Sequence, residues 1–579
     1  MGKDGSPDWL CTENAAPIAD KKGRTGPAWG QEGNVTILGT EVTRGVSAPA
    51  RRQRAGRVRI KAPLKIRPWA IVSCTLAGLA CGAAITVTAP NGLDVAPDAT
   101  VYIAAARNLL QGNDLISRGQ AMTHFPPGYS YMLALNGLVT GDPYRGAVAW
   151  NALCYALTIA LAGLIAYVGS RGSGLAMAAG LAITICARHM FPLHQGIVSE
   201  PPFFVCLMAC AYTLGRYVSR PRMASLLLAG AAIAIAMMVR YAGASMLAPA
   251  VLLVLLSAAP LKSRLLRAGI LTVTACLPLG VWLVHNYFAY DTATHRPLAL
   301  HLVNARDLMT LAKTVTAHYF PRTGPLVRVS LLALPMLAFT VRLVRSPRPS
   351  SLLAVIRRRP LVASLLMFAA GYLLFVMAAK SLMDASISFE IRMIMPFNLL
   401  VALAGTILLL GGSARMKRGI FAGVAIILAV VALNVRELAA EPLTNSGRLV
   451  YAGQAWREAP GIRLAGSMSP GTLIYSDSAD AIEFLTGRPA RMLPQKYSPL
   501  STLPNPDAAR ELARIRQQVL AHEAVVILFK KPPPRPYLLS HAQVQESLAE
   551  LHVAHVPGAD LYGWPGAAEG AVPTVRGGT

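Results

Sequence analysis

The chain alternates between long apolar runs and short polar connections. Apolar runs of roughly 15 to 22 residues recur from Trp69 onward, and about 20 such residues form a helix that crosses a bilayer. The pattern predicts eleven membrane spans, at 69–88, 147–168, 174–190, 197–217, 223–239, 244–260, 268–287, 327–344, 360–379, 393–411 and 419–435. The sequence therefore indicates a multi-span, all-α membrane domain over residues 67–435.

Basic residues divide the connections between these spans into two kinds. Alternate short loops carry dense clusters, such as Arg220 with Arg222 and the run 357–359, whereas the other loops are longer and less basic. Basic clusters mark the cytoplasmic side. With the run RRQRAGRVRIKAPLKIR at 51–67, this predicts a disordered basic cytoplasmic arm over 1–66 that touches anionic lipid headgroups. An odd number of spans then places the C-terminus outside the cell.

The composition agrees with a membrane protein. Only 14% of the 579 residues are charged and 54% are hydrophobic, while a soluble domain carries roughly 25% charged residues. The net charge of +27 would indicate nucleic-acid binding in a soluble protein. Because the loop clusters explain that charge, we expect no nucleic-acid partner.

Several classes of function lack a sequence signal. There is no Walker A loop and no Rossmann glycine fingerprint, so neither ATP-driven transport nor nicotinamide chemistry has support. Seven of the eight cysteines lie in apolar segments, and none has metal-site spacing. Residues 436–579 contain no cysteine, which excludes a disulfide framework there.

The segment after the last span has the pattern of a small α/β domain. TLIYSDSADAIEFLTGRPARMLP reads as strand, turn, helix and turn. A polar helix is expected at 506–522, a strand at AVVILF (524–529) and a further helix at 540–552. This alternation predicts a small extracytoplasmic α/β domain over 436–579 that ends in a loose tail.

The long connection between the first two spans, on the expected outer side, holds the main candidate chemistry. Asp94 and Asp98 flank Pro97 at a predicted helix start. A carboxylate there can cap the helix; alternatively, it can take a proton from a hydroxyl or hold a divalent ion. His124 opens the corner HFPPGY, where it either starts the next surface helix or faces a cavity.

Other polar side chains recur at the outer ends of the spans. Singly they are common interfacial anchors, but their recurrence on one side predicts a functional cavity. An arginine there can bind phosphate through two N–H groups; for Arg392 the alternative is a structural pair with the nearby Glu390. The substrate-binding candidates, besides His124, are Arg188, His189, Glu200, Arg240, Tyr241, Asn286, Glu390 and Arg392.

Six stretches carry a family resemblance. PDATVYIAAARNLLQGN with HFPPGYSYMLAL resembles the first outer loop of the GT-C glycosyltransferases, above all glycosyltransferase family 39. That family includes protein O-mannosyltransferases, the lipid A aminoarabinose transferase and a bacterial group with an RgtA/B/C/D-like domain. Later family motifs are similar to SEPPFFVCLMACAYTL (199–214), VRYAGASMLAPAVLLVLL (239–256), VHNYFAYDTATHRPL (284–298) and FEIRMIMPFNLL (389–400). IYSDSADAIEFLTGRPARMLP (474–494) is similar to the segment that follows the membrane part in the bacterial group. The resemblance covers about 70–494.

The chain departs from one branch of the family. The lipid A branch has Glu-Lys before its two prolines, whereas His124-Phe125 precede them here. This difference removes one phosphate-binding cation that the resemblance would imply, and it argues against the aminoarabinose reaction.

The resemblance implies a GT-C-like fold with juxtamembrane helices in the first outer loop, in a bacterial inner membrane. It also implies an inverting transferase that moves a sugar from a polyprenyl-phosphate donor to a hydroxyl of a lipid, glycan or protein. Asp98, or Asp94 as the second choice, would be the general base, and Arg392, Arg240 or Arg188 would stabilise the departing phosphate. A divalent metal ion stays open as a cofactor.

Two rival functions are weaker. A transporter or flippase of a lipid-linked saccharide would need charges at mid-span depth, often with internal repeats, and neither is evident. A polysaccharide ligase or polymerase would share the donor but generally lacks the early acidic loop.

Overall fold

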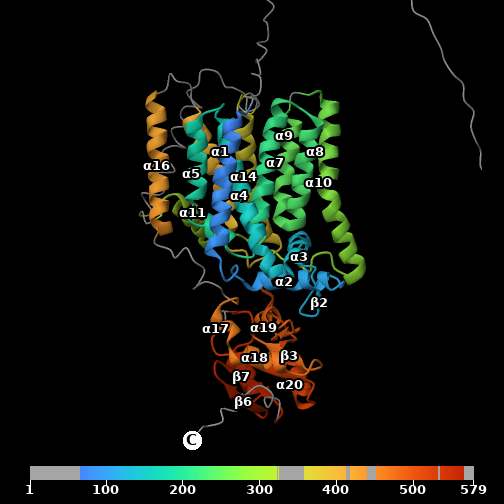
Figure 1. Ribbon diagram of the computed structural model, residues 1–579. Helices are drawn as coiled ribbons and strands as arrows, with labels where there is room; N and C mark the ends of the chain where they lie inside the picture. Colours follow the sequence, from blue (N-terminus) through green and yellow to red (C-terminus); the bar gives the residue numbers. More distant parts are fainter. Residues whose placement is uncertain are drawn as a thin grey trace, which may run out of the picture. The chain divides into compact units, whose positions relative to one another are not determined.

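Ten helical segments form a bundle in a computed structural model of the protein, which describes residues 66–257, 259–321, 324, 356, 358–411, 417–439, 451–532 and 535–565 (Figure 1). The expected basic arm up to residue 65, the expected span 327–344 and the expected tail from residue 566 lie outside these residues. The segments are α1 (Pro68–Thr88), α4 (Pro143–Gly169), α5 (Gly174–Ile185), α7 (Glu200–Ser219), α8 (Met223–Val239), η1 with α9 (Tyr241–Met246 and Leu247–Leu255), α10 (Leu261–Tyr290), α14 (Pro360–Leu382), α15 (Ile391–Leu410) and α16 (Lys417–Ala439).

These segments coincide with ten of the eleven expected spans. Within the described ranges, α1, α4, α10, α14 and α15 are long and apolar enough to cross a membrane. One is shorter than expected: α5 ends at Ile185, although its span was expected to reach residue 190. Helix α8 covers the expected 223–239 and stops where the backbone of Arg240 becomes extended, and the chain continues as a short 3-10 turn. The chain thus has the character of a multi-pass membrane protein.

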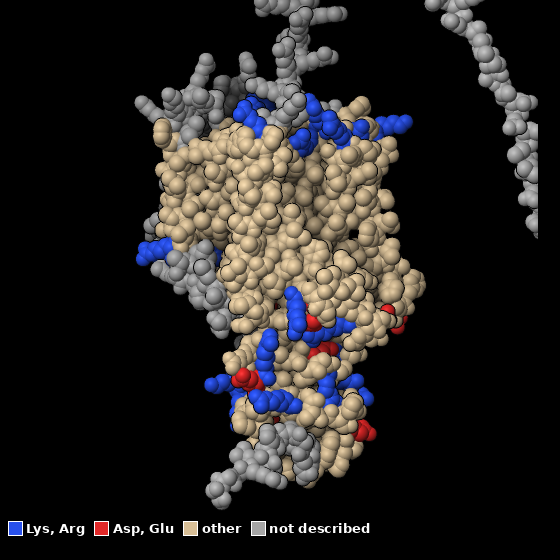
Figure 2. Space-filling view, viewed as in Figure 1, with Lys and Arg blue, Asp and Glu red and all other residues tan. Residues whose placement is uncertain are grey.

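Charge is distributed along the bundle as the loop pattern predicts. Figure 2 shows Lys and Arg gathered at one end of the bundle, above a broad band without charge. The connections at that end include Arg171 between α4 and α5, Arg220 between α7 and α8, and Lys262 at the start of α10. The helix ends that carry the candidate site residues lie at the opposite end.

Small residues allow close packing between α1 and α4. A Cβ atom on Gly82 would lie 2.7 Å from the carbonyl oxygen of Ala152, so a larger residue would push the two helices apart. Where no water is available, such close backbone approach contributes much of the attraction between membrane helices.

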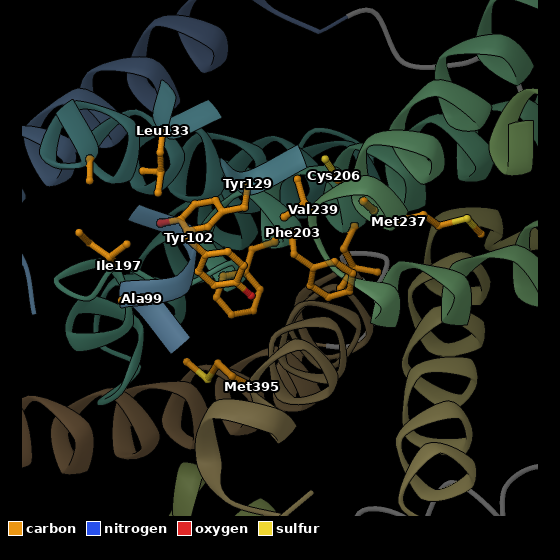
Figure 3. Packing of buried hydrophobic residues seen from close by; sticks show 14 of the residues in the cluster. Ala99, Tyr102, Tyr129, Leu133, Ile197, Phe203, Cys206, Met237, Val239 and Met395 are labelled. Atoms are coloured by element: carbon orange, nitrogen blue, oxygen red, sulfur yellow. The ribbon is translucent and has the colours of Figure 1, made fainter. Parts of the chain in front are cut away.

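The connection between α1 and α4 forms short helices of the kind that the family resemblance implied for this region. Helix α2 (Pro97–Leu110) is followed by a two-residue hairpin, β1 (Ile116–Ser117) and β2 (Gln120–Ala121), and by α3 (Gly128–Thr140). The ring of Tyr102 packs 5.0 Å from Tyr129 and 4.8 Å from Phe125. In Figure 3, Tyr102 and Tyr129 lie beside Phe203 of α7. This aromatic packing fixes α2 across the end of the bundle.

Two further helices lie outside the expected spans. They are α6 (Met190–His194), between α5 and α7, and α11 (Ala305–Tyr319), between α10 and α14. The hydroxyl of Tyr319 donates a hydrogen bond to the carbonyl of Asn398, 2.8 Å away, which joins α11 to α15.

The C-terminal segment contains a five-stranded mixed sheet. Its strands are β3 (Leu473–Ser476), β4 (Arg491–Met492), β5 (Ala524–Phe529), β6 (His552–Val556) and β7 (Ala559–Gly563), in the order β4-β3-β5-β7-β6. β3 pairs in parallel with β4 and β5, while β7 pairs antiparallel with β5 and β6. All six residues of β5 are buried, as expected of a continuous apolar run in a central strand.

Helices flank this sheet. They are α17 (Gln454–Arg457), α18 (Pro460–Ser467), α19 (Ala479–Thr486), α20 (Ala508–Leu520) and α21 (His541–Ser547). The expected strand 524–529 and the expected helix near 506–522 are present. The helix expected at 540–552 is too long, because the chain turns after Ser547 and enters β6 at His552.

Main-chain hydrogen bonds attach this segment to the bundle. The amide of Tyr451 donates to the carbonyl of Val95, 3.2 Å away, and the amide of Ala385 donates to Leu500, 2.8 Å away. Helix α19 also packs directly on α2. The C-terminal sheet therefore lies against the first outer loop.

Candidate active site

Four charged residues from four separate elements meet beneath α2. Glu200 accepts ion pairs from Arg240, 2.7 Å away, and from Arg392, 2.5 Å away. Arg392 also reaches Oδ2 of Asp98 at 3.4 Å. These residues come from the starts of α2, α7 and α15 and from the end of α8. Of the sequence candidates, the structure brings Asp98, Glu200, Arg240 and Arg392 together.

Asp98 is not the capping residue of α2. The N-cap position belongs to Ala96, followed by Pro97, and no side-chain cap hydrogen bond is formed. The side chain of Asp98 instead meets Arg392. The helix start therefore presents a carboxylate to the bundle, and no cap hydrogen bond accounts for its presence there.

Exposure separates the two carboxylates. The side chain of Glu200 is 1% exposed and that of Arg240 is 14% exposed, whereas Arg392 is 32% and Asp98 45% exposed. Arg240 also donates to the Ser199 hydroxyl at 3.2 Å. Glu200 therefore fixes both guanidinium groups from inside, while Asp98 and Arg392 form the accessible edge.

Arg392 does not pair with Glu390, the alternative that the sequence left open. Glu390 is exposed and precedes α15, where its carbonyl accepts the amides of Met393 and Ile394 at 3.1 Å. Glu390 and Arg392 are close in sequence but have different surroundings. The partners of Arg392 come from distant parts of the chain.

The donor set around Asp98 does not fit a divalent cation. Hard cations take several oxygen ligands, but the carboxylates of Asp98 and Glu200 face two guanidinium groups, which would repel the ion. Across the described ranges, no group of three or more His, Cys, Asp or Glu could hold a metal ion.

A second polar group surrounds the corner at His124. The Tyr241 hydroxyl donates to the carbonyl of Thr123, 3.1 Å away, and Arg296 donates to the carbonyl of His124, 3.4 Å away. Arg296 also pairs with Asp384 at 2.6 Å. Burial, with the nearby Arg118 and Arg296, lowers the pKa of His124 to about 4, so its ring is neutral at pH 7.

Sequence reasoning missed Arg296 and Asp384. Arg296 lies in the stretch 284–298 that carries part of the family resemblance. Nothing in that motif marked Arg296 as a site residue rather than an ordinary loop arginine. Its pairing with a carboxylate 88 residues away has no local signal.

The remaining candidates lie apart from the Asp98 cluster. Asp94 forms a parallel bridge with Gly196 through its main chain, and Asn286 is buried with its amide donating to the carbonyl of Ala293, 3.1 Å away. Arg188 pairs with Glu437 of α16 at 3.6 Å, and His189 precedes α6.

An apolar cavity of about 320 Å³ opens beside α3 and α10. Its lining includes Leu115, Met122, Tyr131, Met238 and Trp282. Tyr131 is half exposed, and Val281 in the same wall is 62% exposed. The cavity thus opens sideways from the bundle, where a membrane would supply acyl chains.

Comparison with known proteins agrees with the motifs. Residues 124–282 match the family model described as dolichyl-phosphate-mannose-protein mannosyltransferase. The match runs from His124 to Trp282 and includes Glu200, Arg240 and Tyr241. It confirms the resemblance to glycosyltransferase family 39 and supports a membrane glycosyltransferase.

Two solved structures are similar to the chain. They are ArnT from Cupriavidus metallidurans bound to undecaprenyl phosphate and the same protein in the apo state. Each is 16% identical in sequence to this chain, with a TM-score of 0.42. The similarity covers 85% of this chain in both cases, 97% of the chain bound to undecaprenyl phosphate and 96% of the apo chain. No curated protein matches the chain.

Proposed function

We propose that the protein is an inverting, integral-membrane glycosyltransferase. It moves a sugar from a polyprenyl-phosphate donor to a hydroxyl of an extracytoplasmic acceptor. The observation that carries this proposal is the accessible edge formed by Asp98 and Arg392, 3.4 Å apart. A carboxylate beside a guanidinium supplies both a proton acceptor and a cation for a leaving phosphate.

In the proposed reaction, Asp98 takes the proton of the acceptor hydroxyl as its oxygen attacks the anomeric carbon. The bond between that carbon and the phosphate oxygen breaks, and the electron pair leaves with the polyprenyl phosphate. Arg392 stabilises the charge on the departing phosphate, because a fixed cation in a partly dry site favours charge that develops during the reaction. One displacement at the carbon inverts its configuration.

Glu200 and Arg240 act through Arg392 in this scheme. Glu200 is the buried anion that holds both arginines, so it positions the guanidinium of Arg392 and does not itself meet the substrate. The match to a mannosyltransferase family over residues 124–282 supports a sugar bound to a lipid phosphate as donor.

The apolar cavity beside α10 suits the first isoprene units of the donor. Its lateral opening lets the rest of the tail stay in the bilayer, as a lipid-linked donor requires. The basic end of the bundle would face the cytoplasm by the positive-inside rule, so the site and the sheet formed by β3 to β7 would lie on the outer side.

The direct test is sugar transfer from a polyprenyl-phosphate donor by the full chain in lipid nanodiscs. Wild type is compared with Asp98→Asn and with Asp94→Asn. The main chain of Asp94 forms a bridge with Gly196. Loss in Asp98→Asn alone supports the proposal. Full activity in Asp98→Asn at normal expression would overturn the assignment of the base.

A further inference from the structure

A second cavity, of about 430 Å³, lies against the first outer loop. Its lining comes from the β1–β2 hairpin, the His124 corner and the end of α10, and includes Ser117, Arg118, Gln120, Thr123, His124 and His295. The described lining contains no Asp and no Glu. A cavity with one guanidinium, two imidazoles and several N–H and O–H donors favours an anion over a cation.

This cavity adjoins the proposed reaction centre. Val101 lies in its wall, one helical turn after Asp98 on α2, so both residues occupy one face of that helix. It also shares Met122 and Tyr290 with the apolar cavity. A ligand in the cavity would therefore lie between the lipid-facing opening and Asp98.

Arg118 occupies an unusual backbone position. It forms the two-residue turn of the hairpin with Gly119, and both have positive φ, 54° and 73°. Such turns favour Asn, Asp or Gly, because a Cβ is strained there. Strain of this kind is often retained where a side chain has a function. Among the described residues, no ion pair or side-chain hydrogen bond engages the guanidinium of Arg118.

Glu483 fixes this strained turn from the C-terminal sheet. Its carboxylate accepts the amide of Arg118 at 2.5 Å and the hydroxyl of Ser117 at 3.1 Å. Burial raises the pKa of Glu483. Both oxygens of its carboxylate accept hydrogen bonds from the turn. Arg107 of α2 strengthens the junction, since it donates to the carbonyl of Phe484 at 2.9 Å.

We propose that this cavity is a binding subsite for an anionic group, with Arg118 as its charged contact and Glu483 as the residue that positions Arg118. The anion is a phosphate or carboxylate. It belongs either to the lipid-linked donor or to a water-soluble acceptor. Assigning the anion to a donor or an acceptor rests on the proposed function, whereas the existence of the subsite does not. The rings of His124 and His295 add hydrogen bonds to the anion.

Binding can be measured without any transfer reaction. The full chain in phosphatidylcholine nanodiscs is titrated with undecaprenyl phosphate in one arm and with inorganic phosphate in the other, and the shift in thermal unfolding gives the affinity. Arg118→Gly keeps the left-handed turn and removes the guanidinium. We expect it to fold as well as wild type and to bind one of the two probes about 10-fold more weakly, as loss of a charged hydrogen bond implies.

The control uses an exposed arginine in the first turn of α4. Arg145→Gly changes net charge equally but lies outside the cavity lining, and it should bind both probes as wild type does. Glu483→Gln should weaken the same probe as Arg118→Gly, by a smaller factor. The affected probe identifies whether the anion is on the lipid or in solution.

The outcomes separate the two proposals. Equal affinity of wild type and Arg118→Gly for both probes would overturn the subsite, whatever the transfer assay gives. Loss of binding in Arg118→Gly, combined with no sugar transfer by wild type, would support the subsite and contradict the proposed function.

Discussion

The guanidinium of Arg392 lies 3.4 Å from Oδ2 of Asp98, although 294 positions separate the two residues in the chain. Asp98 belongs to the helix that lies across the end of the bundle, and Arg392 opens the penultimate described helix of the membrane part. Their meeting depends on Glu200, which holds Arg392 from the buried side. The position of Arg392 at the accessible edge of the site therefore depends on how firmly the protein holds the buried carboxylate of Glu200.

Replacing Asp98 should affect the reaction more than the fold. Its side chain is half exposed and makes one long ion pair, so Asp98→Asn should leave the midpoint of thermal unfolding nearly unchanged. Loss of a positioned base should lower kcat about 100-fold or more. Sugar transfer and unfolding, measured on the same preparation, check this expectation. A fall in stability without a specific fall in kcat would contradict it.

Replacing Glu200 should affect both the reaction and the stability of the fold. Glu200→Gln leaves two arginines without their buried anion, and breaking a buried pair destabilises a protein by about 3 kcal/mol. The partial exposure of Arg392 places the expected loss at or below that value. Chemical unfolding of Glu200→Gln measures it, with the exposed Glu390→Gln as the matched control. Equal stability of the two variants would show that Glu200 does not hold the arginines.

Replacing Arg296 should loosen the His124 corner. Arg296→Gln leaves the carboxylate of Asp384 with two hydrogen bonds from Ser386 but without a cation. It also removes a donor from the carbonyl of His124. We expect lower thermal stability and a raised KM for the donor, with partial recovery in Arg296→Lys. If Lys and Gln behave alike, the pairing with Asp384 contributes little.

The pH dependence of stability should reveal one pair in the C-terminal sheet. His541 lies 2.7 Å from Asp477, and this hydrogen bond raises the pKa of His541 above its usual 6.5. The protonated ring is favoured in the folded state, so the stabilisation is complete below the unfolded pKa and is lost as pH rises through the folded pKa. The thermal unfolding of His541→Gln should therefore differ from wild type more at about pH 5.5 than at about pH 9.

An exposed histidine provides the control for this measurement. His552 lies at the start of β6 with its side chain in solvent, so His552→Gln should unfold as wild type does at both pH values. A difference for His541→Gln that is constant with pH would mean that the neutral ring supplies the stabilisation.

The pattern of long apolar runs was enough to locate the helices of the bundle, because a helix that faces lipid on one side and other helices on the other side is apolar all round. It also placed β5, whose six buried residues form one uninterrupted run. The β1–β2 hairpin was missed, because strands of two residues contain no period to detect. Helix 540–552 was drawn too long, because the turn after Ser547 contains no proline or glycine.

The candidate site was predictable as a set of residues and not as a set of contacts. Asp98, Glu200, Arg240 and Arg392 were all named from their positions at the outer helix ends. The partner first considered for Arg392, Glu390, was suggested by proximity in sequence, whereas tertiary packing supplies Glu200 and Asp98. Arg118 and Glu483 lie 365 positions apart, and nothing local to either residue indicates the other.

The hydrogen bond between Arg118 and Glu483 also sets an order of events during synthesis. A ribosome adds about 5 to 20 residues per second, so the hairpin is made on the order of tens of seconds before the carboxylate that fixes it. All the later helices of the bundle must be inserted in that interval. The cavity beside Asp98 is thus completed only when nearly the whole chain has been made, and a prematurely terminated chain would carry the four charged residues without the finished cavity.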